Sequence, residues 1–136
     1  NGINLAFQLL VYPCNDRNFD TASYKEHATG YGLTTQAMEW FWDQYLQGDA
    51  HDQNPYAIPQ RAKDFSSLAP AIFITAQYDP LLSDSEKYAE ALRNAGVTVQ
   101  YREYEGMIHG FYSNMGITPT SATAIDFAAA EIRKLI

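Results

Sequence analysis

Three segments with different periodicities follow one another in the second half of the sequence, and their order restricts the possible folds. Residues Ala71–Ala76 form an almost unbroken apolar run, which is typical of a strand buried on both faces. The next segment begins with Ser83 and Glu86 in capping-box spacing, has apolar residues at helical intervals and ends at Gly96. Residues Val97–Tyr104 then alternate between apolar and polar, which is typical of a strand nearer an edge. Because such strand–helix–strand units have right-handed crossovers, the order predicts an α/β fold with a parallel sheet.

Further predicted elements flank this unit. Leu5–Tyr12 is apolar on both faces, which predicts another buried strand with neighbours from other parts of the chain. Polar and turn-forming residues dominate positions 14–32 and 49–70, which are predicted to be loops. Helical spacing predicts helices within residues 33–48 and 120–136. The apolar face of the first would comprise Met38, Phe41, Trp42, Tyr45 and Leu46, and that of the second Ile125, Ala128, Ala129, Ile132 and Leu135.

Composition and charge exclude several classes of protein. The net charge of −7 argues against binding to nucleic acid or to anionic membranes, which requires a basic surface. No apolar run approaches the roughly 20 residues of a membrane-spanning helix. The single cysteine, Cys14, excludes an internal disulfide and a multi-cysteine metal site, so we expect neither metal nor cofactor. One cysteine and no signal-peptide pattern favour a cytoplasmic protein.

Two titratable residues follow successive strands of the predicted sheet. Asp79 comes just after the strand Ala71–Ala76, and His109 comes a few residues after the strand Val97–Tyr104. Active sites of open α/β sheets collect at the carboxyl ends of the strands, so we expect both side chains at one edge. There a carboxylate can orient an imidazole that serves as general base toward a hydroxyl nucleophile. Taken singly, an aspartate before proline is more often a turn residue and a loop histidine is more often exposed. Asp84 is predicted to cap the following helix or to brace the loop.

The segment from Ala71 to Phe111 resembles the C-terminal part of the hormone-sensitive-lipase-like group of α/β-hydrolases. The motifs that carry the resemblance are Asp-Pro-Leu at Asp79, followed by a tyrosine-bearing helix, Ala-Gly-Val at Ala95 and His-Gly-Phe at His109. Asp84 lies one residue later than in the family's pattern. The resemblance extends back through NPYAIP, AMEWFWDQYL and FQLLVYP, so it covers nearly all of the chain.

The resemblance implies roles for specific residues. Asp79 would be the acid and His109 the base of a Ser-Asp-His triad. The substrate pocket would involve Tyr12, Met38, Trp42, Ile108 and Phe111, with Met38 and Trp42 on a cap-side helix. The implied activity is that of a serine carboxylesterase acting on short-to-medium acyl esters through an acyl-serine intermediate.

Two family motifs are missing from this sequence. The nucleophile of the group lies in a Gly-x-Ser-x-Gly elbow and its oxyanion loop in a His-Gly-Gly-Gly segment, and neither occurs here. Residues 1–136 are therefore predicted to be the C-terminal portion of a single α/β-hydrolase domain, and to be inactive alone. The partner would be the N-terminal portion of the same hydrolase, which carries the serine and the oxyanion loop. The resemblance also implies pairing of two copies through the strand Val97–Tyr104.

Two alternatives retain the fold. One is a non-catalytic, ligand-binding relative, like the plant gibberellin receptors, which lack the histidine; the presence of His109 and Asp79 favours the enzyme. The other is a hydrolase of the dienelactone-hydrolase or prolyl-peptidase type. The cap-like segment AMEWFWDQYL argues against this second alternative.

Overall fold

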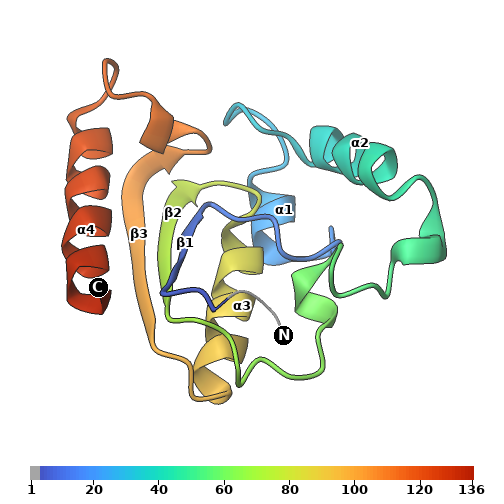
Figure 1. The fold of residues 1–136 in the computed structure, drawn as a ribbon. Helices are drawn as coiled ribbons and strands as arrows, with labels where there is room; N and C mark the ends of the chain where they lie inside the picture. The colour runs from blue at the N-terminus through green and yellow to red at the C-terminus, as the bar shows by residue number, and fades with distance from the viewer. Residues whose placement is uncertain (1–3) are drawn as a thin grey trace.

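Three parallel strands form the sheet of the computed structural model, which describes residues 4–136. The strands β1 (Gln8–Val11), β2 (Ala71–Tyr78) and β3 (Val99–Ile108) lie in that order, with β2 in the centre (Figure 1). Helix α3 (Leu82–Asn94) connects β2 to β3, as the strand–helix–strand pattern predicts. The predicted α/β class with a parallel sheet is confirmed.

Helices cover both faces of this sheet, because alternate residues of β2 face opposite ways. On one face, Phe73 packs with Tyr88 and Leu92 of α3. On the other, Ile74 packs in a cluster with Ala124 and Ala128 of α4 (Pro119–Leu135). The two helices flank the sheet in Figure 1. The first six residues of β2 are consequently buried.

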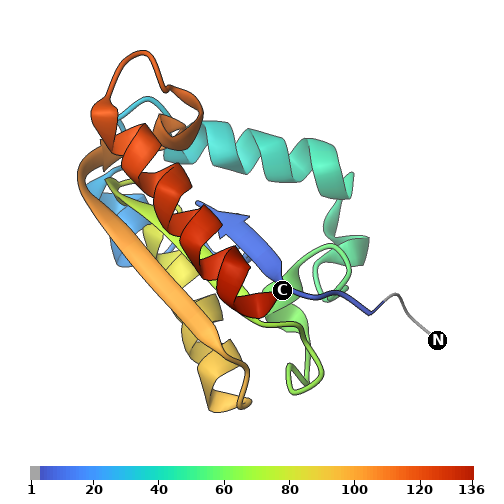
Figure 2. The ribbon, with the colours of Figure 1, turned by 60° about the vertical axis from the view of Figure 1, so that its left-hand side comes forward.

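A third apolar cluster lies beside the carboxyl ends of the strands. It is built around α1 (Ala22–Glu26) and α2 (Thr35–Leu46), and α2 lies across this end of the sheet in Figure 2. Two 3₁₀ turns, η1 (Asp49–His51) and η2 (Pro59–Arg61), follow α2, and a third, η3 (Phe111–Ser113), follows β3. The buried members of the cluster are Tyr24, Met38, Trp42, Leu46, Ile58 and Leu81.

The strands differ from the prediction in length and burial. β2 continues two residues beyond Ala76, and β3 runs from Val99 to Ile108, past its expected end at Tyr104. β1 has only four residues, and all are half-buried rather than buried. Among the described residues β1 pairs with β2 alone, so one of its edges has no strand beside it. β3 is the other outer strand, and pairing of two copies through it stays a prediction.

The helix boundaries contain two corrections. The segment 14–32 is not all loop, because Thr21 caps the short helix α1 by accepting a hydrogen bond from the Tyr24 N–H. The predicted capping box at Ser83 is wrong. The N-cap position of α3 is Leu81, without a side-chain cap, and the Ser83 hydroxyl accepts a hydrogen bond from the Ser23 N–H instead.

The buried helix faces are narrower than predicted or shifted. On α2, Phe41 and Tyr45 are exposed, because the helix packs only through residues four apart: Met38, Trp42 and Leu46. On α4 the buried stripe is shifted by about one position and comprises Ser121, Ala124, Ala128 and Glu131. The Ser121 hydroxyl donates to the Phe111 carbonyl at 2.6 Å, which connects the start of α4 to η3. No α-helix within residues 4–136 has both the length and the apolar character needed to cross a membrane.

Candidate active site

Asp79 and His109 meet at the carboxyl ends of β2 and β3. The Oδ2 atom of Asp79 lies 2.8 Å from Nδ1 of His109, a hydrogen-bond distance. Asp79 is 1% exposed, whereas the His109 side chain is 28% exposed. The carboxylate is therefore shielded from water while the imidazole remains accessible. Because Nδ1 is engaged with Asp79, Nε2 is the ring nitrogen left for proton exchange.

The turn that carries Asp79 is fixed by its own hydrogen bonds. Oδ1 accepts a hydrogen bond from the Leu81 N–H at 2.9 Å, and the Asp79 carbonyl accepts one from the Leu82 N–H at 3.1 Å. One carboxylate oxygen thus holds the turn and the other holds the histidine. An aspartate before proline does serve as a turn residue here, and the same side chain also reaches His109.

An irregularity in β3 brings His109 to this position. The register between β2 and β3 shifts between Ala76 and Tyr78, so that Tyr78 pairs with Ile108. Gly106 lies in this interval with φ of 73°, and its N–H donates to the Gln77 side chain at 2.8 Å. The positive φ favours glycine there, as it does at Gly110, where φ is 86° and the chain turns into η3.

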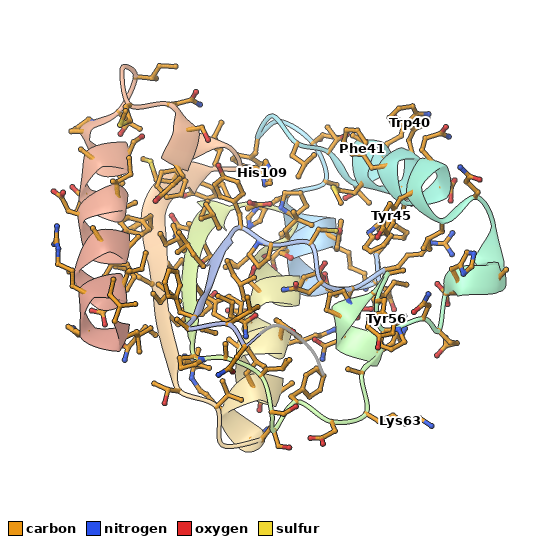
Figure 3. The ribbon with its side chains drawn as sticks, viewed as in Figure 1. Trp40, Phe41, Tyr45, Tyr56, Lys63 and His109 are labelled. Atoms are coloured by element: carbon orange, nitrogen blue, oxygen red, sulfur yellow. The ribbon has the colours of Figure 1, made fainter. Side chains whose placement is uncertain are left out.

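A pocket of about 670 Å³ lies between His109 and helix α2. In Figure 3, Phe41 and Tyr45 project from α2, Tyr56 lies on the following segment, and His109 lies at the end of the sheet. The aromatic wall of the pocket makes it predominantly apolar, as binding sites for small molecules usually are. Its lining comprises Val11, Tyr12, Pro13, Cys14, Leu33, Met38, Phe41, Trp42, Tyr45, Tyr56, Ala57, Pro59, Leu81 and His109.

Three of the five pocket residues expected from the sequence lie in this lining: Tyr12, Met38 and Trp42. The other two lie elsewhere. Phe111 is buried in the cluster between the sheet and α4. Ile108 is 41% exposed, and its side chain lies beside Gly32 rather than in the lining. Sequence analysis did not assign the aromatic wall of Phe41, Tyr45 and Tyr56 to the pocket. No sequence signal distinguished them, because helical spacing placed Phe41 and Tyr45 on the predicted apolar face of α2 and Tyr56 lies in a predicted loop.

Asp84 is buried rather than placed on an exposed helix end. It lies in the first turn of α3 and is 0% exposed, and no side chain within residues 4–136 donates a hydrogen bond to its carboxylate oxygens. Burial raises the pKa of Asp84 to about 8, and the nearby Asp16 carboxylate adds to this increase. The group is therefore mostly protonated at pH 7, unlike a carboxylate that complements a helix dipole. Asp16 itself pairs with Arg61 at 2.8 Å.

The lone cysteine also lines the pocket. Burial raises the pKa of the Cys14 thiol to about 12, and the Asp84 carboxyl contributes to this rise. A thiol in such surroundings is not ionised at neutral pH, so Cys14 is unsuited to act as a nucleophile. No group of three histidine, cysteine or acidic side chains within residues 4–136 is arranged to hold a metal ion.

Comparison with known proteins supports the same family. A family model described as alpha/beta hydrolase fold matches residues 1–113. The carboxylic ester hydrolase LipN of Mycobacterium tuberculosis is 35% identical over 127 residues, which is 93% of this chain and 34% of that protein. An ethyl acetate hydrolase of Pseudomonas putida is 35% identical over 104 residues, which is 76% of this chain and 33% of that protein.

Solved structures agree. A fungal esterase from Rhizomucor miehei superimposes with a TM-score of 0.89 and 36% identity, over 96% of this chain and 41% of that one. A thermostable esterase from Pseudomonas putida superimposes with a TM-score of 0.76 and 44% sequence identity, over 81% of this chain and 35% of that one. The chain thus spans about a third to two-fifths of the length of these relatives. By sequence and by structure, this chain belongs to the α/β-hydrolase fold family, in its hormone-sensitive-lipase-like group of carboxylesterases.

Proposed function

We propose that this chain supplies the acid and the base of a Ser-Asp-His triad in a serine carboxylesterase. The observation that supports the proposal best is the 2.8 Å contact between Asp79 Oδ2 and His109 Nδ1 beside a largely apolar pocket. A buried carboxylate, an accessible imidazole and an apolar cavity are the parts of an acyl-transfer site that this chain can contribute.

The remaining parts come from elsewhere in the hydrolase. Acyl transfer needs a nucleophile and hydrogen-bond donors for the developing oxyanion. The sequence contains neither a Gly-x-Ser-x-Gly elbow nor a His-Gly-Gly-Gly loop, and the relatives are more than twice as long as the matched region. We call the segment that provides these motifs the serine-bearing part, and the combination of it with this chain the assembled hydrolase. The chain without the serine-bearing part is inactive in this proposal.

The proposed reaction starts with proton transfer from the serine hydroxyl to His109 Nε2. As the proton leaves, the serine oxygen bonds to the ester carbonyl carbon, and the carbonyl π electrons move onto oxygen. Asp79, held by the Leu81 N–H, stabilises the imidazolium that forms. When the intermediate collapses, the bond to the alcohol oxygen breaks and His109 returns its proton to that oxygen. Water then attacks the acyl-serine by the same route, releasing the acid and the free serine.

The pocket wall supports a substrate with an apolar group of short-to-medium length. Met38, Phe41 and Trp42 from α2 line the space that opens beside His109. Among the relatives, one is named for the hydrolysis of ethyl acetate, a small uncharged ester. Small uncharged esters with apolar acyl groups fit this wall better than charged ones would.

The test is a substitution of the proposed base in the assembled hydrolase. His109→Ala should lower kcat for a short-chain p-nitrophenyl ester by about 10³-fold or more, as losses of triad residues do. His51→Ala, at an exposed position, is the control and should leave kcat unchanged. Turnover within about tenfold of the parent in His109→Ala would reject the proposal. A protein that binds an ester without ever releasing alcohol would instead support the ligand-binding alternative.

A further inference from the structure

Tyr12 has an unusual backbone conformation at the edge of the site. Its φ is 35°, and the only other non-glycine residue with positive φ within residues 4–136 is Gln47. Gln47 is explained by its place at the C-cap of α2, where the left-handed conformation is common. Tyr12 caps no helix. It follows β1 and precedes Pro13, and a residue before proline normally has an extended backbone.

Strain of this kind persists only where the surroundings enforce it, and it concentrates at functional sites. Here the Tyr12 N–H still donates to the Ile74 carbonyl at 2.6 Å, which anchors the backbone to β2. The Tyr12 ring lies against the imidazole of His109, with ring centroids 4.4 Å apart and planes inclined at 53°. It also contacts Phe111, whose ring centroid is 6.2 Å away in an edge arrangement. The enforced conformation therefore coincides with a contact to the proposed base.

The hydrogen bond to Asp79 leaves one motion of the imidazole unrestrained. A single contact at Nδ1 fixes the distance to the carboxylate, but the ring can still swing about that contact. An aromatic ring against the imidazole removes this freedom. It also places π-electron density beside a group that becomes a cation whenever Nε2 accepts a proton, and aromatic rings attract cations.

From these observations we infer that Tyr12 is a positioning residue. Its ring fixes the plane of the His109 imidazole so that Nε2 faces the pocket, and it stabilises the imidazolium that forms during acyl transfer. The inference rests on the proposed function, because it acts through His109 as general base. The aromatic ring is the required feature, and the phenolic hydroxyl is not.

The pH profile of activity can report on the contact between Tyr12 and His109 only if the other titratable groups beside the imidazole stay unchanged. Asp79 faces the imidazole from the turn after β2, and Tyr12 faces it from the end of β1. Cys14, Tyr45 and Tyr56 line the same pocket, and the Cys14 thiol is neutral. None of these groups other than Tyr12 changes in the experiment, so a change in the pH profile reports on the Tyr12 ring.

The experiment uses the assembled hydrolase, after His109→Ala has been shown to abolish turnover. Tyr12→Phe should retain kcat within about twofold, whereas Tyr12→Leu should lower kcat about tenfold with KM almost unchanged. The acidic limb of the kcat/KM profile should move to lower pH in Tyr12→Leu, because the protonated imidazole loses its aromatic neighbour. Tyr101→Leu is the matched control. Tyr101 stacks on Phe73 on the α3 face of the sheet, so this variant loses packing without changing the profile.

A second series keeps the test decisive if Tyr12→Leu does not fold. Phenylalanine and its mono-, di- and trifluorinated analogues at position 12 keep the shape of the ring and progressively weaken its attraction for a cation. The acidic limb should move stepwise to lower pH with each fluorine. An acidic limb that stays at the same pH throughout the series would overturn the inference and leave the role of His109 intact. Equal losses of kcat in Tyr12→Phe and Tyr12→Leu would do the same. If His109→Ala were active, the proposed function itself would fail first.

Discussion

Ser23 and Ser83, 60 positions apart in the sequence, exchange hydrogen bonds directly behind the turn that holds Asp79. The Ser83 N–H donates to Ser23 Oγ at 3.1 Å, and the Ser23 N–H donates to Ser83 Oγ at 3.3 Å. The Ser23 hydroxyl also donates to the Pro80 carbonyl at 2.6 Å. These bonds fasten α1 to the first turn of α3 and to the residue after Asp79. The segment between β1 and α2, which contains α1, thereby supports the turn that carries Asp79.

Removing the Ser23 hydroxyl should therefore weaken both the fold and the site. Ser23→Ala leaves the Ser83 N–H and the Pro80 carbonyl without their partners, and buried groups left unpaired cost about 1–3 kcal/mol. Urea denaturation of the assembled hydrolase should show this loss, and kcat should fall because Asp79 is less firmly held. Ser67→Ala at an exposed position is the control. Equal midpoints for the two variants would show that the serine pair does not support the turn.

Asp79 and Asp84 should respond differently to the same isosteric substitution. Asp79→Asn removes the charge that faces Nδ1 of His109, and the analogous change in a triad lowers kcat by roughly 10⁴-fold with the geometry intact. Asp84→Asn replaces a carboxyl that is mostly protonated at pH 7, so kcat at neutral pH should change little. The measurement is the steady-state kcat of both variants of the assembled hydrolase at neutral pH. A larger loss in Asp84→Asn would transfer the orienting role to that residue.

Asp84 should also make stability depend on pH. Its pKa is raised from 3.8 to about 8 in the folded state, so the folded protein binds more protons than the unfolded chain between these values. The contribution of Asp84 to stability is then greatest below about pH 4. It falls as pH rises toward 8, by up to about 1.4 kcal/mol per pH unit. Above pH 8 the contribution of Asp84 becomes constant.

The measurement compares the urea midpoints of the parent and of Asp84→Asn at about pH 5, 7 and 9, which cover the range in which Asp84 titrates. The parent should lose more stability between pH 5 and 9 than the variant, because asparagine does not titrate. Asp126→Asn, at an exposed position on α4, serves as the control and should follow the parent. Identical pH dependence in all three proteins would mean that Asp84 is not kept protonated by burial.

The parts of the structure that sequence analysis predicted are those with strong local periodicity. The strand–helix–strand unit from β2 to β3 is one example, and the positions of Asp79 and His109 follow from it, because parallel strands end at the same edge. The helix α1 was missed since its five residues have no periodicity of their own. It is stabilised by the local cap at Thr21 and by the burial of Tyr24, and only the burial depends on tertiary contacts.

Two features of the site could not be predicted from the sequence, because tertiary contacts determine them. The burial of Asp84 depends on packing against Asp16 and its surroundings, 68 positions away in sequence numbering, and a carboxylate in a first helical turn normally indicates an exposed charge. The positive φ of Tyr12 is likewise imposed by its neighbours, and a tyrosine before proline predicts extended backbone. Local sequence rules fail at these positions because tertiary contacts override them.

The last prediction concerns the 136-residue chain without its serine-bearing part, which should not hydrolyse esters. Its sequence has no elbow serine and no glycine-rich oxyanion loop, and the thiol of Cys14, the one cysteine near His109, has its pKa raised to about 12. A base and its orienting acid cannot form the acyl intermediate alone. The pure chain should therefore show only background release of p-nitrophenol from a short-chain ester, and addition of the serine-bearing part should restore turnover. His109→Ala in the same mixture is the control, and it should stay at background. Turnover by the pure chain that disappears in His109→Ala would reveal a nucleophile within these 136 residues and refute the division of the triad between two parts.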